Sequence, residues 1–208
     1  MPTPITHVVL TEEIFDDYFI EKDKKTFYIG TCFPDIRRTA KIPRSQTHLK
    51  SLILPDAMTE KSFMAGFKFH SILDPLRAKY FRQNNLYGLI PESKYIIHAS
   101  KVFEDSLVYN NIDNWHEFID YLDDILKEEI DFGIKKEVVK KWHISLQDYF
   151  SQKPNENSID GLFKNVGYSQ EVCDEINKTF KEIHNCEEFK EQLNNFHMKF
   201  KEILKTYV

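Results

Sequence analysis

The sequence predicts an all-α fold, an irregular multi-helix bundle. Apolar residues recur at helical spacing along most of the 208-residue chain, and no strand-like runs lie between the helical stretches. Only 6 glycines are present, which is few for a sheet built on tight hairpins. The chain also lacks the GxGxxG and GxxxxGKS/T phosphate loops and the GxSxG nucleophile elbow. Nucleotide-dependent and α/β-hydrolase chemistries are therefore not expected.

The first predicted element is a helix over residues 3–21, and a loop follows it. Thr3 is a suitable N-cap for this helix, and Pro4 stands at its first helical position. Residues 27–48 contain a glycine and two prolines and show no sustained period. We expect an ordered loop over 27–48.

A helical pattern returns over residues 61–74. Pro75 disfavours helical geometry at Asp74, so we expect this helix to end or kink there. Three further helices are predicted over residues 91–111, 114–130 and 135–150.

The stretch "SQKPNENS" over residues 151–158 is the clearest linker signal in the chain. Residues 1–152 are therefore predicted to form a helical core that carries the metal site described below. Residues 153–208 are predicted to form a C-terminal helical extension packed on the same domain, with two helices from about Ser169. A stripe of apolar residues in the second helix should pack on the body of the protein, although a homodimer formed through it is compatible with the pattern: Phe189, Leu193, Phe196, Phe200 and Leu204.

Composition and charge exclude several classes of protein. The net charge of −5 excludes a generally basic nucleic-acid binder. The 3 cysteines, Cys32, Cys173 and Cys186, form no CxxC pair, so a disulfide framework and a thiolate zinc site are not expected. No secretory leader and no membrane span can be recognised. We expect a soluble, cytoplasmic protein without stable membrane insertion.

Histidines and acids in the first half suggest a metal site. His70 and Asp74 are four residues apart, so they lie on one helical face. His7 lies in the first turn of a helix, where the helix dipole favours a neutral ring, as a metal ligand requires. Asp35 and His48 lie in the predicted loop that precedes the helix of His70 and Asp74. Each residue alone is more typical of a core or turn position, but together they form a nitrogen and oxygen ligand set that suits Zn²⁺.

The order of the motifs "TH", "FYIGTCFPDI", "TH" and "GFKFHSILD", over roughly residues 4–105, resembles the zinc-dependent phospholipase C family, which is related to single-strand-specific zinc nucleases. The resemblance implies an irregular helical bundle of that type with one to three zinc ions, and phosphoester hydrolysis by metal-activated water. It makes Asp35, His48, His70 and Asp74 the ligands of a first ion, with Asp74 bridging to a second ion that His7 binds. It also makes Asp35 the general base.

A third ion would require residues that this sequence supplies only in part. The resemblance offers His98 and Glu104 as ligands, but Tyr80 stands where the family has a histidine. The two residues are six apart rather than four, so Glu104 would point about 120° away from His98 on an ideal helix, whereas Asp105 would face with it.

A basic stretch suggests an anionic substrate. Arg37, Arg38, Lys41 and Arg44 lie between Asp35 and His48 with no acid among them. Because arginine forks suit phosphate oxygens, Arg37 and Arg38 are candidate substrate-binding residues. The alternative is a solvated loop that balances the acidic bulk.

Two functions follow from these residues. The first is a metal-dependent, phospholipase C-like phosphoester hydrolase, with zinc as the expected metal. Its substrate is open among phosphate-containing small molecules, phospholipids and nucleic acids. The alternative is a non-enzymatic helical relative that keeps a structural or vestigial metal site and binds a protein partner. A third class, the HD phosphohydrolases, ranks last because the chain has no His-Asp dipeptide.

Overall fold

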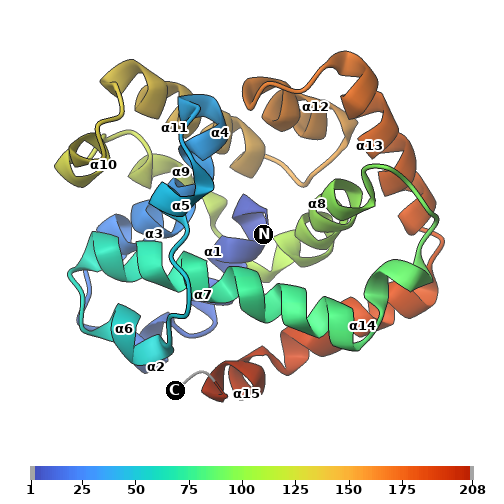
Figure 1. Ribbon diagram of the computed structural model, residues 1–208, viewed down its shortest axis with the longest axis horizontal. Coiled ribbons are helices and arrows are strands. Elements are labelled where there is room, and N and C mark those ends of the chain that lie inside the picture. Colours follow the sequence, from blue (N-terminus) through green and yellow to red (C-terminus); the bar gives the residue numbers. More distant parts are fainter. Residues whose placement is uncertain (1–2, 207–208) are drawn as a thin grey trace.

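The computed structural model describes residues 3–206, and this part of the chain is helical with no strand (Figure 1). The prediction of an all-α, irregular multi-helix bundle is thus confirmed. The α-helices are α1 (Pro4–Glu12), α2 (Phe15–Tyr18), α3 (Lys24–Cys32), α4 (Arg37–Ala40), α5 (Arg44–Thr47), α6 (Leu54–Met58), α7 (Ser62–Gln83), α8 (Ile96–Val108), α9 (Trp115–Tyr121), α10 (Lys127–Asp131), α11 (Lys136–Phe150), α12 (Glu156–Asn165), α13 (Gln170–Ile183), α14 (Glu187–Met198) and α15 (Phe200–Lys205). Short 3-10 helices are η1 (Phe33–Ile36), η2 (Leu86–Leu89) and η3 (Tyr109–Asn111). Within residues 3–206, no helix combines the length and the hydropathy that crossing a bilayer requires.

Two glycines allow α3 and α7 to pack closely against each other. A Cβ atom on Gly30 would overlap the carbonyl oxygen of Phe63, and one on Gly66 would overlap the carbonyl oxygen of Phe27. Only glycine allows the two backbones to approach this closely. The contact brings the end of α3 against the first turns of α7, one turn before the predicted ligand His70.

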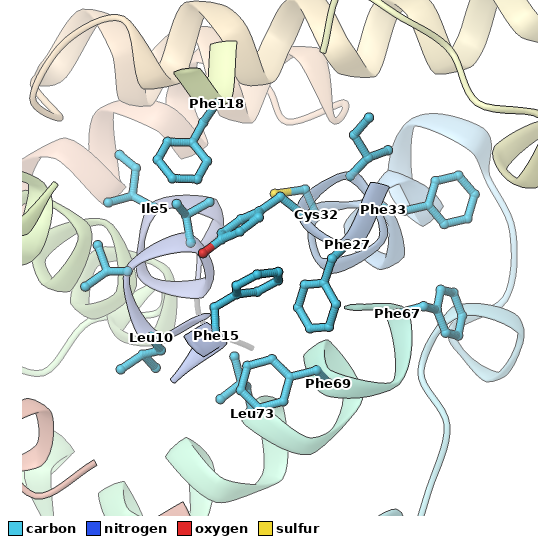
Figure 2. Close-up of a cluster of buried hydrophobic side chains, with 14 of the residues drawn as sticks. Ile5, Leu10, Phe15, Phe27, Cys32, Phe33, Phe67, Phe69, Leu73 and Phe118 are labelled. Atoms are coloured by element: carbon cyan, nitrogen blue, oxygen red, sulfur yellow. The ribbon is translucent and has the colours of Figure 1, made fainter. Parts of the chain in front are cut away.

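Aromatic side chains fill the space beside this contact. In Figure 2, Phe15, Phe27 and Phe69 come from α2, α3 and α7 and point toward one another. The Phe15 and Phe27 rings meet edge to face, with centroids 5.3 Å apart, and Phe27 and Phe69 are 6.3 Å apart. Such pairs add to the free energy gained from burying the rings. The scaffold of α1, α3 and α7 is therefore rigidly packed under the candidate site.

The predicted loop over residues 27–48 is wrong. Most of this segment is helical in α3, η1, α4 and α5. The last three of these elements have only 4 residues each, so none is long enough to show a helical period. The loop prediction failed because it depended on periodicity.

Of the two outcomes predicted at Asp74, an end or a kink, the end is wrong, because α7 continues through Pro75 to Gln83. The proline removes one backbone donor from the helix. Residues beyond it are buried, including Leu76 at 1% exposure and Phe81 at 0%. Their burial stabilises the helix beyond the missing hydrogen bond.

The other predicted helices are present, but they begin or end at different residues. The helix over 135–150 is α11, whereas those over 3–21 and 114–130 each divide into two shorter helices, and that over 91–111 begins at Ile96 and ends in η3. Thr3 has extended backbone geometry at the N-cap, but its hydroxyl donates to the carbonyl of Lys101 rather than capping α1. The linker stretch ends inside α12, which is capped by Asn155.

The C-terminal residues pack on the body of the protein. All five residues of the predicted apolar stripe are fully buried, namely Phe189, Leu193, Phe196, Phe200 and Leu204. Phe196, Phe200 and Leu204 join the cluster built on α1, α3 and α7, while Phe189 and Leu193 join a second cluster with α8 and α13. In Figure 1, α14 and α15 run along one side of α7. The prediction that the stripe faces the body is confirmed.

Candidate metal centre

Five of the predicted ligands converge at the centre of the fold. We call them the metal cluster: His7 on α1, Asp35 on η1, His48 directly after α5, and His70 and Asp74 on α7. In the described part of the chain, His7, His70 and Asp74 form one group able to hold an ion, and Asp35, His48 and His70 form another. Within each group the ligand atoms lie within 4.8 Å of one another. His70 is shared, so the two groups are adjacent.

The distances centre on His48 Nε2. This atom lies 3.2 Å from His70 Nε2, 3.4 Å from Asp74 Oδ2 and 3.7 Å from Asp35 Oδ1. His7 Nε2 lies 3.8 Å from Asp74 Oδ1. The His7 and His70 rings stack with centroids 3.9 Å apart. These are the separations expected of atoms around a shared ion rather than of a closed hydrogen-bond network.

The far side of each ring fixes which nitrogen carries the proton. His70 Nδ1 donates to the carbonyl of Thr31 at 2.8 Å, and His7 Nδ1 donates to the carbonyl of Thr3 at 3.2 Å. A carbonyl oxygen can only accept, so in a neutral ring Nε2 is the nitrogen with the lone pair. Carbonyl partners of this kind orient histidine ligands in metal sites.

His48 is oriented in the same way by a side chain. The Thr47 hydroxyl oxygen lies 2.8 Å from His48 Nδ1 and 3.5 Å from the carbonyl oxygen of Arg44. His48 Nε2 and His70 Nε2 lie 3.2 Å apart. With the His48 proton on Nδ1, both Nε2 lone pairs would be directed at a cation placed between them.

Burial keeps the three rings uncharged. It lowers the pKa of His48 to about 3 and the pKa of His70 to about 4. It lowers the pKa of His7 well below the ordinary value of 6.5. Burial, followed by the charge of Asp74, raises the pKa of Asp35. The rings are therefore neutral near pH 7, which metal ligation requires.

Two buried acceptor atoms in the cluster show that its donor set fits a cation. His7 Nε2 and Asp35 Oδ1 have no hydrogen-bond partner among residues 3–206. Buried polar atoms are nearly always partnered, so each such atom calls for an explanation. Imidazole nitrogens and carboxylate oxygens are ligands that Zn²⁺ accepts. The residues present thus fit the metal that the sequence predicts.

Arg44 supplies one positive charge from the edge of the cluster. Its guanidinium donates to Asp74 Oδ2 at 2.5 Å, although the side chain is 47% exposed. It also lines a cleft of about 520 Å³, which we call the Arg44 cleft, with His48, Lys50, Ser71 and Asp74. The metal cluster is accessible from this side.

Asp35 lines a second cavity, different from the Arg44 cleft. We call it the aromatic cavity, of about 80 Å³, and its polar lining is Thr3, Asp35, Arg38, His98, Lys101, Trp142 and Tyr168. Of the two predicted substrate-binding residues, Arg38 therefore lines a hollow at the cluster. Arg37 is not among the residues lining either hollow, and burial lowers the pKa of its guanidinium.

The residues predicted for a third ion do not come together. His98 Nε2 is 2.9 Å from the Tyr168 hydroxyl, whereas Glu104 is bonded to Arg77 and His197. The two groups of possible ligands in the described chain include neither His98 nor Glu104. The reason is the six-residue spacing, which sends the two side chains to different neighbours. Tyr80 likewise turns away, donating its hydroxyl to the carbonyl of Gln192.

Sequence reasoning missed three residues around the aromatic cavity. Lys101 lies three residues after His98 on α8, so helical spacing was a usable signal for it. Burial and then Arg77 lower the pKa of Lys101 to about 8, with Asp35 and Asp74 acting in the opposite direction. Trp142 and Tyr168 come from distant segments and carry no local signal.

No family model matches the chain, and no curated protein or solved structure is significantly similar to it. The resemblance to the zinc-dependent phospholipase C family stays a prediction from the sequence. What is known of the site comes from the geometry of these residues.

Proposed function

We propose that this protein is a metal-dependent hydrolase of phosphoester bonds, with zinc as its metal. The observation that carries the proposal is the convergence of three neutral imidazole Nε2 atoms on two carboxylates, deep in the fold. Each Nδ1 already has its own oxygen partner, so the Nε2 atoms are left for an ion. The number of ions this set would hold is one or two. The phospholipase C-like identity is part of the proposal and rests on the motif order alone.

A divalent ion held here would lower the pKa of a coordinated water and offset charge on a phosphate oxygen. Asp35 is placed to accept a proton at Oδ1, because its carboxylate belongs to the cluster and also lines the aromatic cavity. Arg44 keeps Asp74 in place and presents the exposed part of its guanidinium to the Arg44 cleft. Such a group stabilises the negative oxygens of a phosphate.

The setting we propose is the cytoplasm. All three cysteines are free, in agreement with a reducing compartment.

The test begins with metal content. The full-length protein should contain at least one equivalent of zinc, and it should hydrolyse p-nitrophenyl phosphate or bis(p-nitrophenyl) phosphate. Chelation should remove the activity, and zinc should restore it. His70→Ala should lose both metal and activity while keeping the helical circular dichroism. His116→Ala is the matched control, since this histidine is exposed on α9.

Two results would count against the proposal. A protein that holds no metal as purified and takes up none when zinc is added would refute the metal centre. Bound zinc without turnover of either ester would favour the alternative, a non-enzymatic protein with a structural metal.

A further inference from the structure

The aromatic cavity offers more than access to Asp35. Its lining divides into a polar part beside Asp35 and an apolar part formed by Pro4, Leu162, Phe163 and Val166. Leu162 and Phe163 are 7% and 6% exposed and come from α12. A cavity of about 80 Å³ exceeds several-fold the roughly 10–15 Å³ that one water needs. It has room for a small solute.

The polar part contains one buried donor without a partner. Trp142 is 2% exposed, and its indole N–H has no acceptor within the described residues. The cationic residues Lys101 and Arg38 line the same cavity. A buried donor without an acceptor is costly, and a ligand that accepts a hydrogen bond would remove the cost.

A short chain of contacts links three residues of the cavity lining, Arg38, Tyr168 and His98. The Arg38 guanidinium lies over the Tyr168 ring at 5.1 Å, and the Tyr168 hydroxyl is 2.9 Å from His98 Nε2. These contacts hold Arg38 on the lining although its side chain is exposed. The Arg38 guanidinium is therefore positioned before any ligand arrives.

We propose that the aromatic cavity is the substrate pocket of the hydrolase, and that it selects a compact phosphate monoester with an apolar organic group. Arg38, Lys101 and the Trp142 N–H receive the phosphate oxygens next to Asp35, and the α12 side chains receive the organic group. A monoester carries about two negative charges near neutral pH, because its second pKa is about 6, whereas a diester carries one. Two cations and a neutral donor match the monoester better. This assignment of substrate class rests on the proposed function.

Binding of phenylphosphonate, a non-hydrolysable mimic of phenyl phosphate, tests the pocket without relying on turnover. Isothermal titration calorimetry on the zinc-loaded protein should give a Kd at least tenfold lower than that of methylphosphonate. Arg38→Gln and Lys101→Met should each raise the Kd for phenylphosphonate at least tenfold. Trp142→Phe should raise it several-fold, because it keeps a ring and loses the N–H.

Controls separate loss of the pocket from loss of the fold. Arg82→Gln and Lys153→Met remove exposed cations elsewhere and should change the Kd by less than twofold. If Lys101→Met reduces the helical circular dichroism, Lys101→Arg replaces it as the test, and a Kd close to that of the wild type supports the need for a cation there.

The outcomes distinguish the pocket from the proposed reaction. Binding that depends on Arg38 and Lys101, in a protein that hydrolyses no ester, supports the pocket and refutes the reaction. Turnover without phenylphosphonate binding, or binding that none of the three substitutions alters, overturns the pocket and leaves the hydrolase proposal intact. A preference for bis(p-nitrophenyl) phosphate over p-nitrophenyl phosphate also overturns the monoester assignment.

Discussion

Helix α7 carries two buried polar clusters less than one turn apart, and they are built in opposite ways. His70 and Asp74 belong to the metal cluster. Arg77, three residues after Asp74, forms what we call the Arg77 triad with Glu104 and His197. Arg77 Nε donates to Glu104 Oε2 at 2.5 Å, and His197 Nε2 is 3.2 Å from Glu104 Oε1.

The difference lies in where the positive charge comes from. The triad contains its own cation, and the guanidinium also lies 3.7 Å from the centroid of the Phe81 ring. The metal cluster has mainly acceptors facing inward, and the cation at its edge, Arg44, is half exposed. A buried carboxylate needs a compensating charge. Inside the triad a fully buried guanidinium supplies that charge, whereas the guanidinium that reaches the metal cluster is half exposed.

The largest effect should come from removing the triad's cation. Arg77→Met leaves Glu104 buried without its charge partner, so the free energy of unfolding should fall by about 3–5 kcal/mol. Urea unfolding measures this. The double variant Arg77→Met/Glu104→Gln removes both charges and should recover more than half of the loss. A loss below about 1 kcal/mol in the single variant would mean that the triad does not compensate charge.

A further buried carboxylate, Asp105, is held by neutral hydrogen-bond donors. It accepts from the Thr6 backbone N–H at 2.7 Å, the Thr6 hydroxyl at 2.6 Å and the Tyr149 hydroxyl at 3.0 Å. Burial raises the pKa of Asp105 from its ordinary 3.8 to about 6, and these neutral donors oppose the rise. Because burial raises its pKa, this carboxyl keeps its proton to a higher pH in the folded protein than in the unfolded one.

Stability should therefore depend on pH through Asp105. Between pH 3.8 and about 6 the folded state binds more protons than the unfolded state, so stability falls as pH rises through this window. The full contribution is about 3 kcal/mol, from the difference between the two pKa values. Asp105→Asn cannot titrate and should show a flatter profile in urea unfolding from pH 4 to 7. Equal slopes for the variant and the wild type would contradict the assignment.

Zinc should stabilise the metal cluster and leave the triad unaffected. At a free concentration 100 times its Kd, zinc should add about 2.7 kcal/mol to the free energy of unfolding. His70→Ala should abolish this gain, and the double variant Arg77→Met/Glu104→Gln should keep it. Thermal unfolding with and without zinc measures the difference. An equal gain in wild type and His70→Ala would place the zinc elsewhere.

The contrast between these clusters also explains what could be predicted from the sequence. His70 and Asp74 were recoverable because both lie on one helix at a fixed spacing. His7, Asp35 and His48 required the order of motifs, since they lie on or beside three separate short elements that packing brings to α7. Packing between elements has no periodic signature.

The remaining residues could not be assigned without the fold. His197 reaches Glu104 across 93 positions of the chain, and Tyr168 reaches His98 across 70. The segment after α3 was misread because its 4-residue helices are too short to show a period. Local spacing predicts a pair on one helix, whereas partners between helices depend on packing that only the folded chain reveals.

The smallest effect on stability is expected at Tyr80, the position at which the resembled family has a histidine. Position 80 is six residues beyond Asp74, so it points about 120° away from Asp74 on α7. Its hydroxyl donates to the Gln192 carbonyl at 3.3 Å, and its ring lies 4.9 Å from that of Phe196. Tyr80→His should therefore leave zinc stoichiometry unchanged and cost about 1 kcal/mol of stability, through the lost hydrogen bond and ring contact.

Metal analysis of Tyr80→His beside the wild type checks this result, with Tyr80→Phe as a variant that keeps the ring and loses only the hydrogen bond. An additional equivalent of zinc bound by Tyr80→His alone would show that α7 presents position 80 to an ion. In that case the separation of the two clusters along the helix would be incomplete. Unchanged stoichiometry agrees with a metal-binding part of α7 that ends at Asp74. The next buried polar residue, Arg77, then begins the part of the helix that carries its own cation.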